Sequence, residues 1–127
     1  MRLSYLLLAV WLWVLPGAAV AQDTRLVIVE QAGCIYCVHW DRDVAPEYPK
    51  TAEGRAAPLR RVDIGDLPED LKLKSRPVLT PTFILVQDGQ EVARLEGYPG
   101  EDFFWPLLNR MLDEAGIERT IPEETKS

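Results

Sequence analysis

The stretch Gly33-Cys34-Ile35-Tyr36-Cys37 decides how the rest of this chain is interpreted, because it holds both cysteines of the 127-residue sequence. It follows an uninterrupted apolar run, Leu26–Val29, which is typical of a buried strand. A Cys-x-x-Cys pair after a strand and a glycine turn lies at a helix start, where unpaired backbone amides stabilise the thiolate of the first cysteine. We therefore predict a redox-active disulfide in which Cys34 attacks and Cys37 resolves the mixed disulfide.

Two other roles for the cysteine pair have less support. A structural disulfide stabilises a protein most when it closes a long loop, and Cys34 and Cys37 enclose only two residues. A metal site would need further ligands, and the single histidine, His39, is expected at the surface. We therefore expect no metal and no cofactor beyond the disulfide. A non-catalytic dithiol that binds metal or senses redox state is kept as the alternative.

The first 21 residues are typical of a signal peptide. Arg2 precedes an apolar run from Leu6 to Leu15, and Ala19-Val20-Ala21 has the small-x-small pattern of a signal-peptidase site. The run is shorter than the roughly 20 apolar residues of a membrane span, so an uncleaved anchor is the less favoured alternative. We predict cleavage after Ala21, one domain over residues 22–117 and a polar tail over residues 118–127.

Charge excludes one class of partner. The chain carries 14 Lys and Arg residues against 20 Asp and Glu residues, a formal net charge of −6. No stretch of it forms a basic stripe. We therefore expect no binding to nucleic acid, whose phosphates require clustered cations.

Strand and helix patterns alternate along the rest of the chain. Two apolar runs predict central strands and two half-polar segments predict edge strands, the last two strands being joined by an Asp88-Gly89 hairpin. Pro106 is expected to kink the last helix or to delay its start. The order predicts an α/β fold, a four-stranded mixed sheet with helices on both faces. The predicted strands are Arg25–Glu30, Leu59–Ile64, Thr82–Val86 and Glu91–Leu95. The predicted helices are Cys34–Ala45, a short one within Gly65–Arg76, and Phe104–Ala115.

Most of the mature chain resembles the thioredoxin superfamily. The resemblance rests on three features in the family's order: the Cys34–Cys37 pair, the Thr80-Pro81-Thr82 junction and the Asp88-Gly89 hairpin. It implies the minimal thioredoxin fold and the activity of a thiol–disulfide oxidoreductase. It also implies that Pro81 has a cis peptide bond and packs against the dithiol, which leaves the backbone of Thr80 free to pair with an extended substrate segment.

A closer similarity is to the SoxS type, the periplasmic thioredoxins encoded with bacterial sulfur-oxidation genes. It is carried by Val29–Cys34, Tyr48–Gly54 and Glu96–Trp105. It implies a periplasmic reductase that keeps the cysteine of a sulfur-oxidation carrier protein active, with electrons from a membrane dithiol transporter of the DsbD/CcdA type. We expect a monomer. A general thiol oxidase or isomerase is the alternative, but the oxidising extreme of the family has histidine between its cysteines, and this chain has Ile35-Tyr36.

Several further positions have two interpretations each. Six residues before the first cysteine, where thioredoxin has a buried proton-accepting aspartate, this chain has Ile28. Glu30, at the end of the same strand, is a candidate proton relay or a solvated strand end. Tyr36 shapes substrate access or covers the helix surface. Phe103 and Trp105 form an exposed docking patch or complete the edge of the core.

Overall fold

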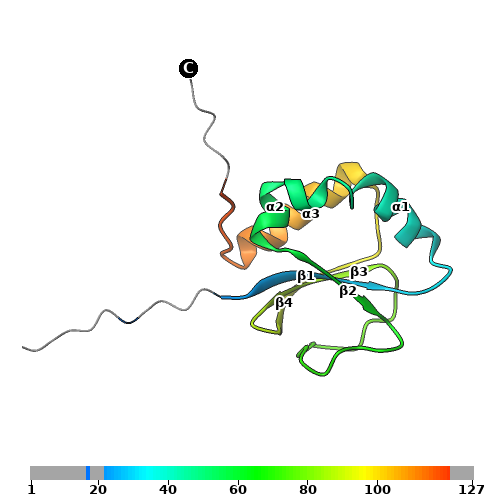
Figure 1. Ribbon diagram of the computed structural model, residues 1–127, viewed down its shortest axis with the longest axis horizontal. Coiled ribbons are helices and arrows are strands. Elements are labelled where there is room, and N and C mark those ends of the chain that lie inside the picture. Colours follow the sequence, from blue (N-terminus) through cyan, green and yellow to red (C-terminus); the bar gives the residue numbers. More distant parts are fainter. Residues whose placement is uncertain (1–16, 18–21, 121–127) are drawn as a thin grey trace, which may run out of the picture.

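The structure is a computed structural model that describes Gly17 and residues 22–120. The expected signal peptide therefore lies outside the described residues, apart from Gly17. The expected cleavage site after Ala21 and most of the polar tail lie outside them too. Within them, four strands form one mixed sheet (Figure 1). The strands are β1 (Thr24–Glu30), β2 (Leu59–Asp63), β3 (Thr82–Gln87) and β4 (Gln90–Glu96).

The order of the sheet is β2-β1-β3-β4. β1 is parallel to β2 and antiparallel to β3, and β3 and β4 are antiparallel neighbours. The apolar runs are thus the two central strands and the half-polar segments are the two edges, so the predicted four-stranded mixed sheet is confirmed. The hairpin predicted at Asp88-Gly89 joins β3 to β4, and both of its residues have positive φ angles.

The three α-helices of the described chain lie together on one face of the sheet (Figure 1). They are α1 (Ile35–Asp43), α2 (Ala52–Ala56) and α3 (Glu101–Glu114), with a 3-10 turn, η1, at Tyr48–Lys50. None of these helices is long and apolar enough to cross a membrane.

An aromatic cluster fixes α1 on the sheet. Trp40 of α1 is fully buried, and its ring centroid lies 5.5 Å from that of Phe83 on β3. Phe83 in turn lies 5.0 Å from Phe104 of α3. Because Trp40 follows Cys37 by one helical turn, burial of its ring also sets how α1 is rotated and which way the dithiol faces.

The opposite face of the sheet is covered by a loop, so the prediction of helices on both faces is wrong. No helix forms within Gly65–Arg76, where a short one was expected. Instead the backbone of Lys72 pairs with that of Gly89 and Glu91 beside the β3–β4 hairpin. This pairing competes with helix formation and lets three leucines cover the apolar residues of the central strands: Leu67, Leu71 and Leu73 pack against the cluster of Val27, Val29, Val62, Ile84 and Val86.

Pro106 does not delay the start of the last helix, so the second of the two effects expected of it is absent. α3 begins at Glu101, where the backbone amides of Phe103 and Phe104 both bond to the carbonyl of Gly100. A proline six residues into a helix leaves the carbonyl four residues before it without its usual donor. That carbonyl belongs to Asp102, which is exposed, so water can take the place of the missing amide.

Candidate active site

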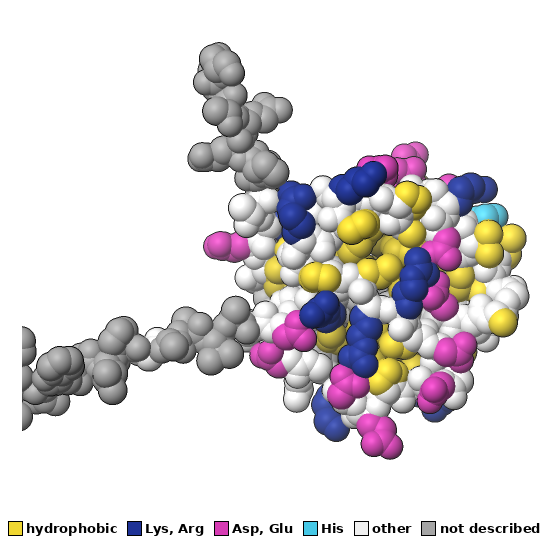
Figure 2. Space-filling model, viewed as in Figure 1, with side chains coloured by type: hydrophobic (Ala, Val, Ile, Leu, Met, Phe, Trp, Pro, Cys, Tyr) yellow, Lys and Arg dark blue, Asp and Glu magenta, His cyan; other side chains and the backbone are white. Residues whose placement is uncertain are grey.

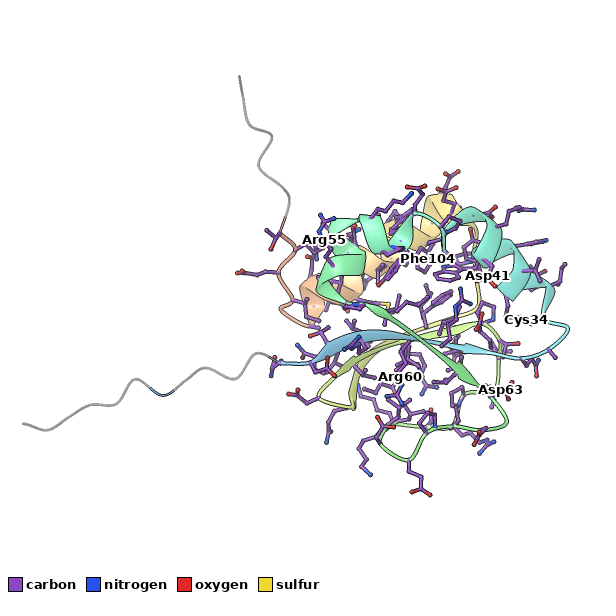
Figure 3. The ribbon with its side chains drawn as sticks, in the orientation of Figure 1. Cys34, Asp41, Arg55, Arg60, Asp63 and Phe104 are labelled. Carbon is purple, nitrogen blue, oxygen red and sulfur yellow. A yellow bond between two sulfur atoms is a disulfide. The ribbon has the colours of Figure 1, made fainter. Side chains whose placement is uncertain are left out.

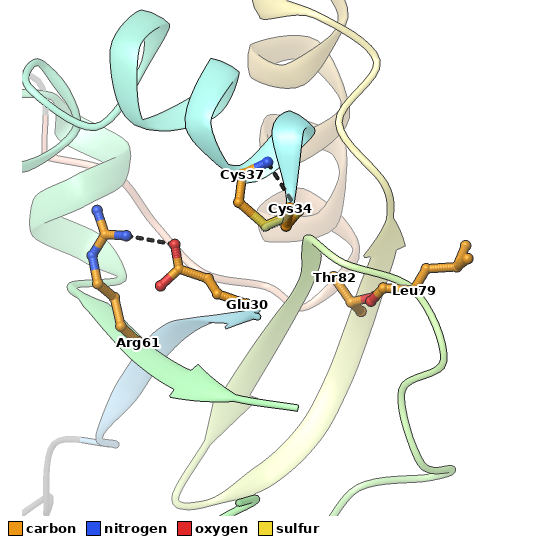
Figure 4. Close-up of a disulfide and its surroundings, with 6 residues drawn as sticks. All are labelled: Glu30, Cys34, Cys37, Arg61, Leu79 and Thr82. Atoms are coloured by element: carbon orange, nitrogen blue, oxygen red, sulfur yellow. Dashed lines mark hydrogen bonds and ion pairs between the residues drawn. A yellow bond between two sulfur atoms is a disulfide. The ribbon is translucent and has the colours of Figure 1, made fainter. Parts of the chain in front are cut away.

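The two cysteines lie at the start of α1 and are joined by a disulfide (Figure 4). Cys34 is the N-cap residue, and its Sγ accepts a hydrogen bond of 3.1 Å from the backbone amide of Cys37. Cys37 is 5% exposed, whereas Cys34 is only partly buried. A partner protein can therefore reach Cys34 first, and Cys34 is also the sulfur that receives the stabilisation of the helix start.

The predicted cis peptide bond is present between Thr80 and Pro81. Pro81 is buried, and its carbonyl accepts a hydrogen bond of 2.8 Å from the amide of Gly97. On the other side of the bond, the Thr82 hydroxyl donates to the carbonyl of Leu79 at 2.7 Å (Figure 4). These bonds hold the segment that enters and leaves Pro81 against the end of the sheet.

A mainly apolar hollow of about 350 Å³ lies between this segment and the start of α1. Tyr36, between the two cysteines, lines it together with Leu79, Thr80, Gly97 and Tyr98. The structure thus brings two predicted substrate contacts, Tyr36 and Thr80, to one surface. Burial, followed by a hydrogen bond to Asp43, raises the pKa of Tyr98 to about 12, so its phenol stays neutral at physiological pH.

Several exposed large apolar side chains belong to the two segments that contribute Tyr36 and Leu79 to this hollow. Tyr36 is 56% exposed and Leu79 50% exposed, and three further exposed residues belong to the same two segments: Ile35, Val38 and Val78. Figure 2 shows apolar side chains at the end of the molecule where α1 begins. Such a concentration of exposed apolar surface beside a reactive group is suited to contact with another protein.

A second, polar hollow of about 390 Å³ lies on the other side of the dithiol. Both cysteines line it, together with Glu30, Asp41 and Arg61. Arg61 donates to Glu30 at 2.6 Å and to Asp41 at 2.7 Å, and its guanidinium lies 5.6 Å from the centre of the Trp40 ring. Glu30 is therefore a half-buried, ion-paired carboxylate beside the cysteines, not a freely solvated strand end.

Sequence reasoning missed Arg61 and Asp41. Asp41 is exposed, but it lines the polar hollow and lies at the same end of the molecule as Cys34 (Figure 3). Arg61 reaches the site because β2 pairs in parallel with β1, with Arg61 opposite Ile28. The alternation of β2 alone could have placed Arg61 on the helix face, but only the register of the pairing shows which residue it meets.

The remaining candidates lie outside this arrangement. His39 is half-buried and meets the Tyr36 ring edge-on at 5.9 Å. Phe103 is 65% exposed, but Trp105 is partly buried and stacks on Tyr48 with ring centroids 6.1 Å apart. Trp105 thus completes the core edge, and the two do not form an exposed pair. Among the described residues, no three His, Cys, Asp or Glu side chains are grouped as a metal site would require.

Comparison with known proteins finds two informative relatives, while no family model matches the chain. The crystal structure of the periplasmic thioredoxin SoxS from Paracoccus pantotrophus, in its reduced form, is 52% identical, with a TM-score of 0.72. The match covers 73% of this chain and 99% of that one. A disulfide bond formation protein from Brevibacillus choshinensis is 35% identical over an alignment of 96 residues, and the match covers 71% of this chain and 72% of that protein.

The different environments of the two sulfurs predict different reactivity after reduction. Cys34 should react with iodoacetamide at least about tenfold faster than Cys37, because it is the more accessible sulfur and the one that accepts the backbone amide. Timed alkylation at neutral pH, followed by peptide mass mapping, measures both rates. The variants Cys34→Ser and Cys37→Ser serve as matched controls, and faster labelling of Cys37 would reverse the assignment.

Proposed function

Because the chain belongs to the thioredoxin superfamily of thiol–disulfide oxidoreductases, we propose that it is an exported reductase of protein disulfides in the periplasm. The observation that carries this proposal is the placement of Cys34. It caps α1 with an accessible sulfur, while Cys37 is buried behind it. Thr80, beside the cis bond, lines the apolar hollow together with Tyr36, and its backbone is proposed to hydrogen-bond with the substrate segment.

The reaction needs only the two sulfurs. In the reduced protein the Cys34 thiolate attacks one sulfur of a substrate disulfide, and the second substrate sulfur leaves as a thiolate. The Cys37 thiol then loses its proton and attacks Cys34 Sγ, which re-forms the Cys34–Cys37 disulfide and releases the remaining substrate sulfur. The substrate has gained two electrons and the protein has lost two. An external dithiol must reduce the protein again before the next turnover.

Glu30 is proposed to accept the proton from Cys37. Both residues line the same hollow, and Arg61 holds the Glu30 carboxylate in place from β2 (Figure 4). Cys37 is almost inaccessible to solvent, so a fixed base beside it shortens the route by which its proton leaves. Ile28, at the position of the thioredoxin aspartate, has no group that can do this.

Replacing Glu30 with glutamine should slow the second step. In a single turnover with a mixed-disulfide peptide, we expect Glu30→Gln to lower the rate of peptide thiol release roughly tenfold or more at pH 7. The difference should vanish above pH ~8.5, where a thiol ionises without help. Asp63→Asn is the matched control, because Asp63 lines the same hollow. An equal effect of both variants would point to local charge, not proton transfer.

Reduction is favoured over oxidation by two observations. The residues between the cysteines are Ile35-Tyr36, without the histidine found at the oxidising extreme of the family. A structural match that covers 99% of the other chain is to a protein described as a periplasmic thioredoxin. The similarity to a disulfide bond formation protein favours a second candidate, a general thiol oxidase or isomerase in the same compartment.

The proposed substrate is the cysteine of a sulfur-oxidation carrier protein. Similarity to SoxS over nearly the whole of that chain supports this assignment. The exposed apolar residues around Cys34 suit a substrate that presents its cysteine on an extended segment. Electrons are proposed to come from a membrane dithiol transporter of the DsbD/CcdA type, since a reductase in an oxidising compartment needs a source of electrons from outside it. The protein is proposed to act as a monomer.

Removing the resolving cysteine should trap the substrate. In Cys37→Ser, Cys34 can attack but the mixed disulfide cannot be resolved from within the protein. Expressed in its native periplasm, this variant should carry one dominant adduct that reductant releases, and mass spectrometry should identify it as the sulfur-oxidation carrier.

The double variant Cys34→Ser with Cys37→Ser is the control and should trap nothing. A broad set of secreted proteins bound to Cys37→Ser would instead indicate the general oxidase or isomerase. Absence of any adduct, with tightly retained metal in the wild-type protein, would favour the non-catalytic dithiol.

A further inference from the structure

On the edge strand β4, Glu91 and Arg94 form a largely buried ion pair. Both side chains are hydrogen-bonded to the loop that leads to the cis bond. Arg94 donates to both carboxylate oxygens of Glu91, at 2.8 and 2.9 Å. The same two side chains bond to the loop backbone: Glu91 accepts from the amide of Lys74 at 2.8 Å, and Arg94 donates to the carbonyl of Ser75 at 2.7 Å. The side chain of Glu91 is 3% exposed and that of Arg94 14% exposed.

The backbone of Lys74 and Ser75, which these side chains hold, lies a few residues before the proposed substrate contacts. Three residues separate Ser75 from Leu79, which lines the apolar hollow, and Thr80 follows. At the far end Thr82 holds the carbonyl of Leu79. The segment that meets the substrate is thus tied down on both sides, by Glu91 and Arg94 before it and by Thr82 after it.

We propose that Glu91 and Arg94 are positioning residues, which hold the segment of Val78, Leu79 and Thr80 in the geometry that pairs with a substrate peptide. This inference rests on the proposed role of Thr80. The loop has neither a helix nor a long strand to fix it, so its shape depends on such tethers. A segment already ordered before binding loses less conformational entropy when the substrate arrives, which makes binding tighter.

The charge of this pair argues for a role beyond stability. A buried ion pair often stabilises a protein no more than apolar residues of similar volume would. Burial alone would raise the pKa of Glu91, but hydrogen bonds from Arg94 and from the Lys74 amide lower it below its ordinary value. What apolar residues could not supply is the two directed bonds to the backbone of Lys74 and Ser75.

The chain offers a matched control within the same loop. Arg60 of β2 forms a two-bond pair with Asp70, at 2.6 and 2.9 Å. This pair also ties the loop to the sheet, but it joins side chain to side chain, is more exposed, and lies farther along the chain from Thr80. Breaking it removes one tether of the loop without touching the backbone next to the substrate segment.

The test compares two disulfide probes with one leaving group. The first is a ten-residue peptide whose single cysteine is joined to thionitrobenzoate, and the second is 5,5′-dithiobis(2-nitrobenzoate), which has no peptide backbone. In single turnovers with the reduced full chain, Glu91→Gln should raise the half-saturating peptide concentration about tenfold. The limiting rate, the reduction potential and the reaction with the second probe should stay within about twofold of wild type.

Arg94→Lys should show the same pattern, because one ammonium cannot replace the forked contacts to Glu91 and Ser75. It provides the test if Glu91→Gln fails to fold. Asp70→Asn should leave the half-saturating peptide concentration unchanged. The inference is overturned if folded Glu91→Gln or Arg94→Lys binds the peptide like wild type, or if Asp70→Asn weakens binding equally. It is also overturned if both probes lose reactivity together.

The proposed function fails in a different way. If wild type prefers the peptide to the backbone-free probe no more than free glutathione does, pairing at Thr80 does not occur, and the inference falls with it. If wild type discriminates and the variants do too, only the positioning role of Glu91 and Arg94 is wrong.

Discussion

The hydrogen bond from the Cys37 amide to Cys34 Sγ is the contact on which the chemistry of this protein depends. A helix leaves its first amides without partners, and a capping side chain usually supplies an oxygen to one of them. Here the cap is a sulfur, so the backbone itself stabilises negative charge on the atom that is proposed to act as the nucleophile. No metal or cofactor is needed for this effect, because the amides of any helix start provide it.

The packing of α1 holds that helix start between an apolar hollow and a polar hollow. Burial of Trp40 against the sheet sets the rotation of α1, so that Cys37 faces inward and Cys34 outward. On one side lies the apolar hollow of Tyr36 and Leu79, which suits a peptide. On the other lies the polar hollow with Glu30, which suits proton transfer. The disulfide therefore separates the surface proposed to bind the substrate from Glu30, the group proposed to accept the proton of Cys37.

Local patterns were sufficient for the strands and for the cysteine pair. The apolar runs are the central strands, Cys34 caps α1, and Pro81 follows a cis bond as the family resemblance implied. The helix predicted within Gly65–Arg76 is absent because the conformation of that segment depends on partners far away in the sequence. Leu71 and its neighbours have spacing that suits a short helix, yet the sheet needs a cover on its second face and the hairpin offers backbone partners.

Arg61 was not predicted for the same reason. Its position opposite Ile28 follows from the parallel register of β2 on β1, which no local pattern encodes.

This dithiol is proposed to give electrons to its substrates, and the reduction potential of the Cys34–Cys37 pair decides whether it can. Equilibration with defined glutathione buffers, read out by the tryptophan fluorescence of the chain, yields that potential. A reductase should have a value close to that of thioredoxin, about −270 mV, and clearly more negative than about −200 mV. A value near −120 mV, as in the strongly oxidising periplasmic proteins of this superfamily, would contradict the account.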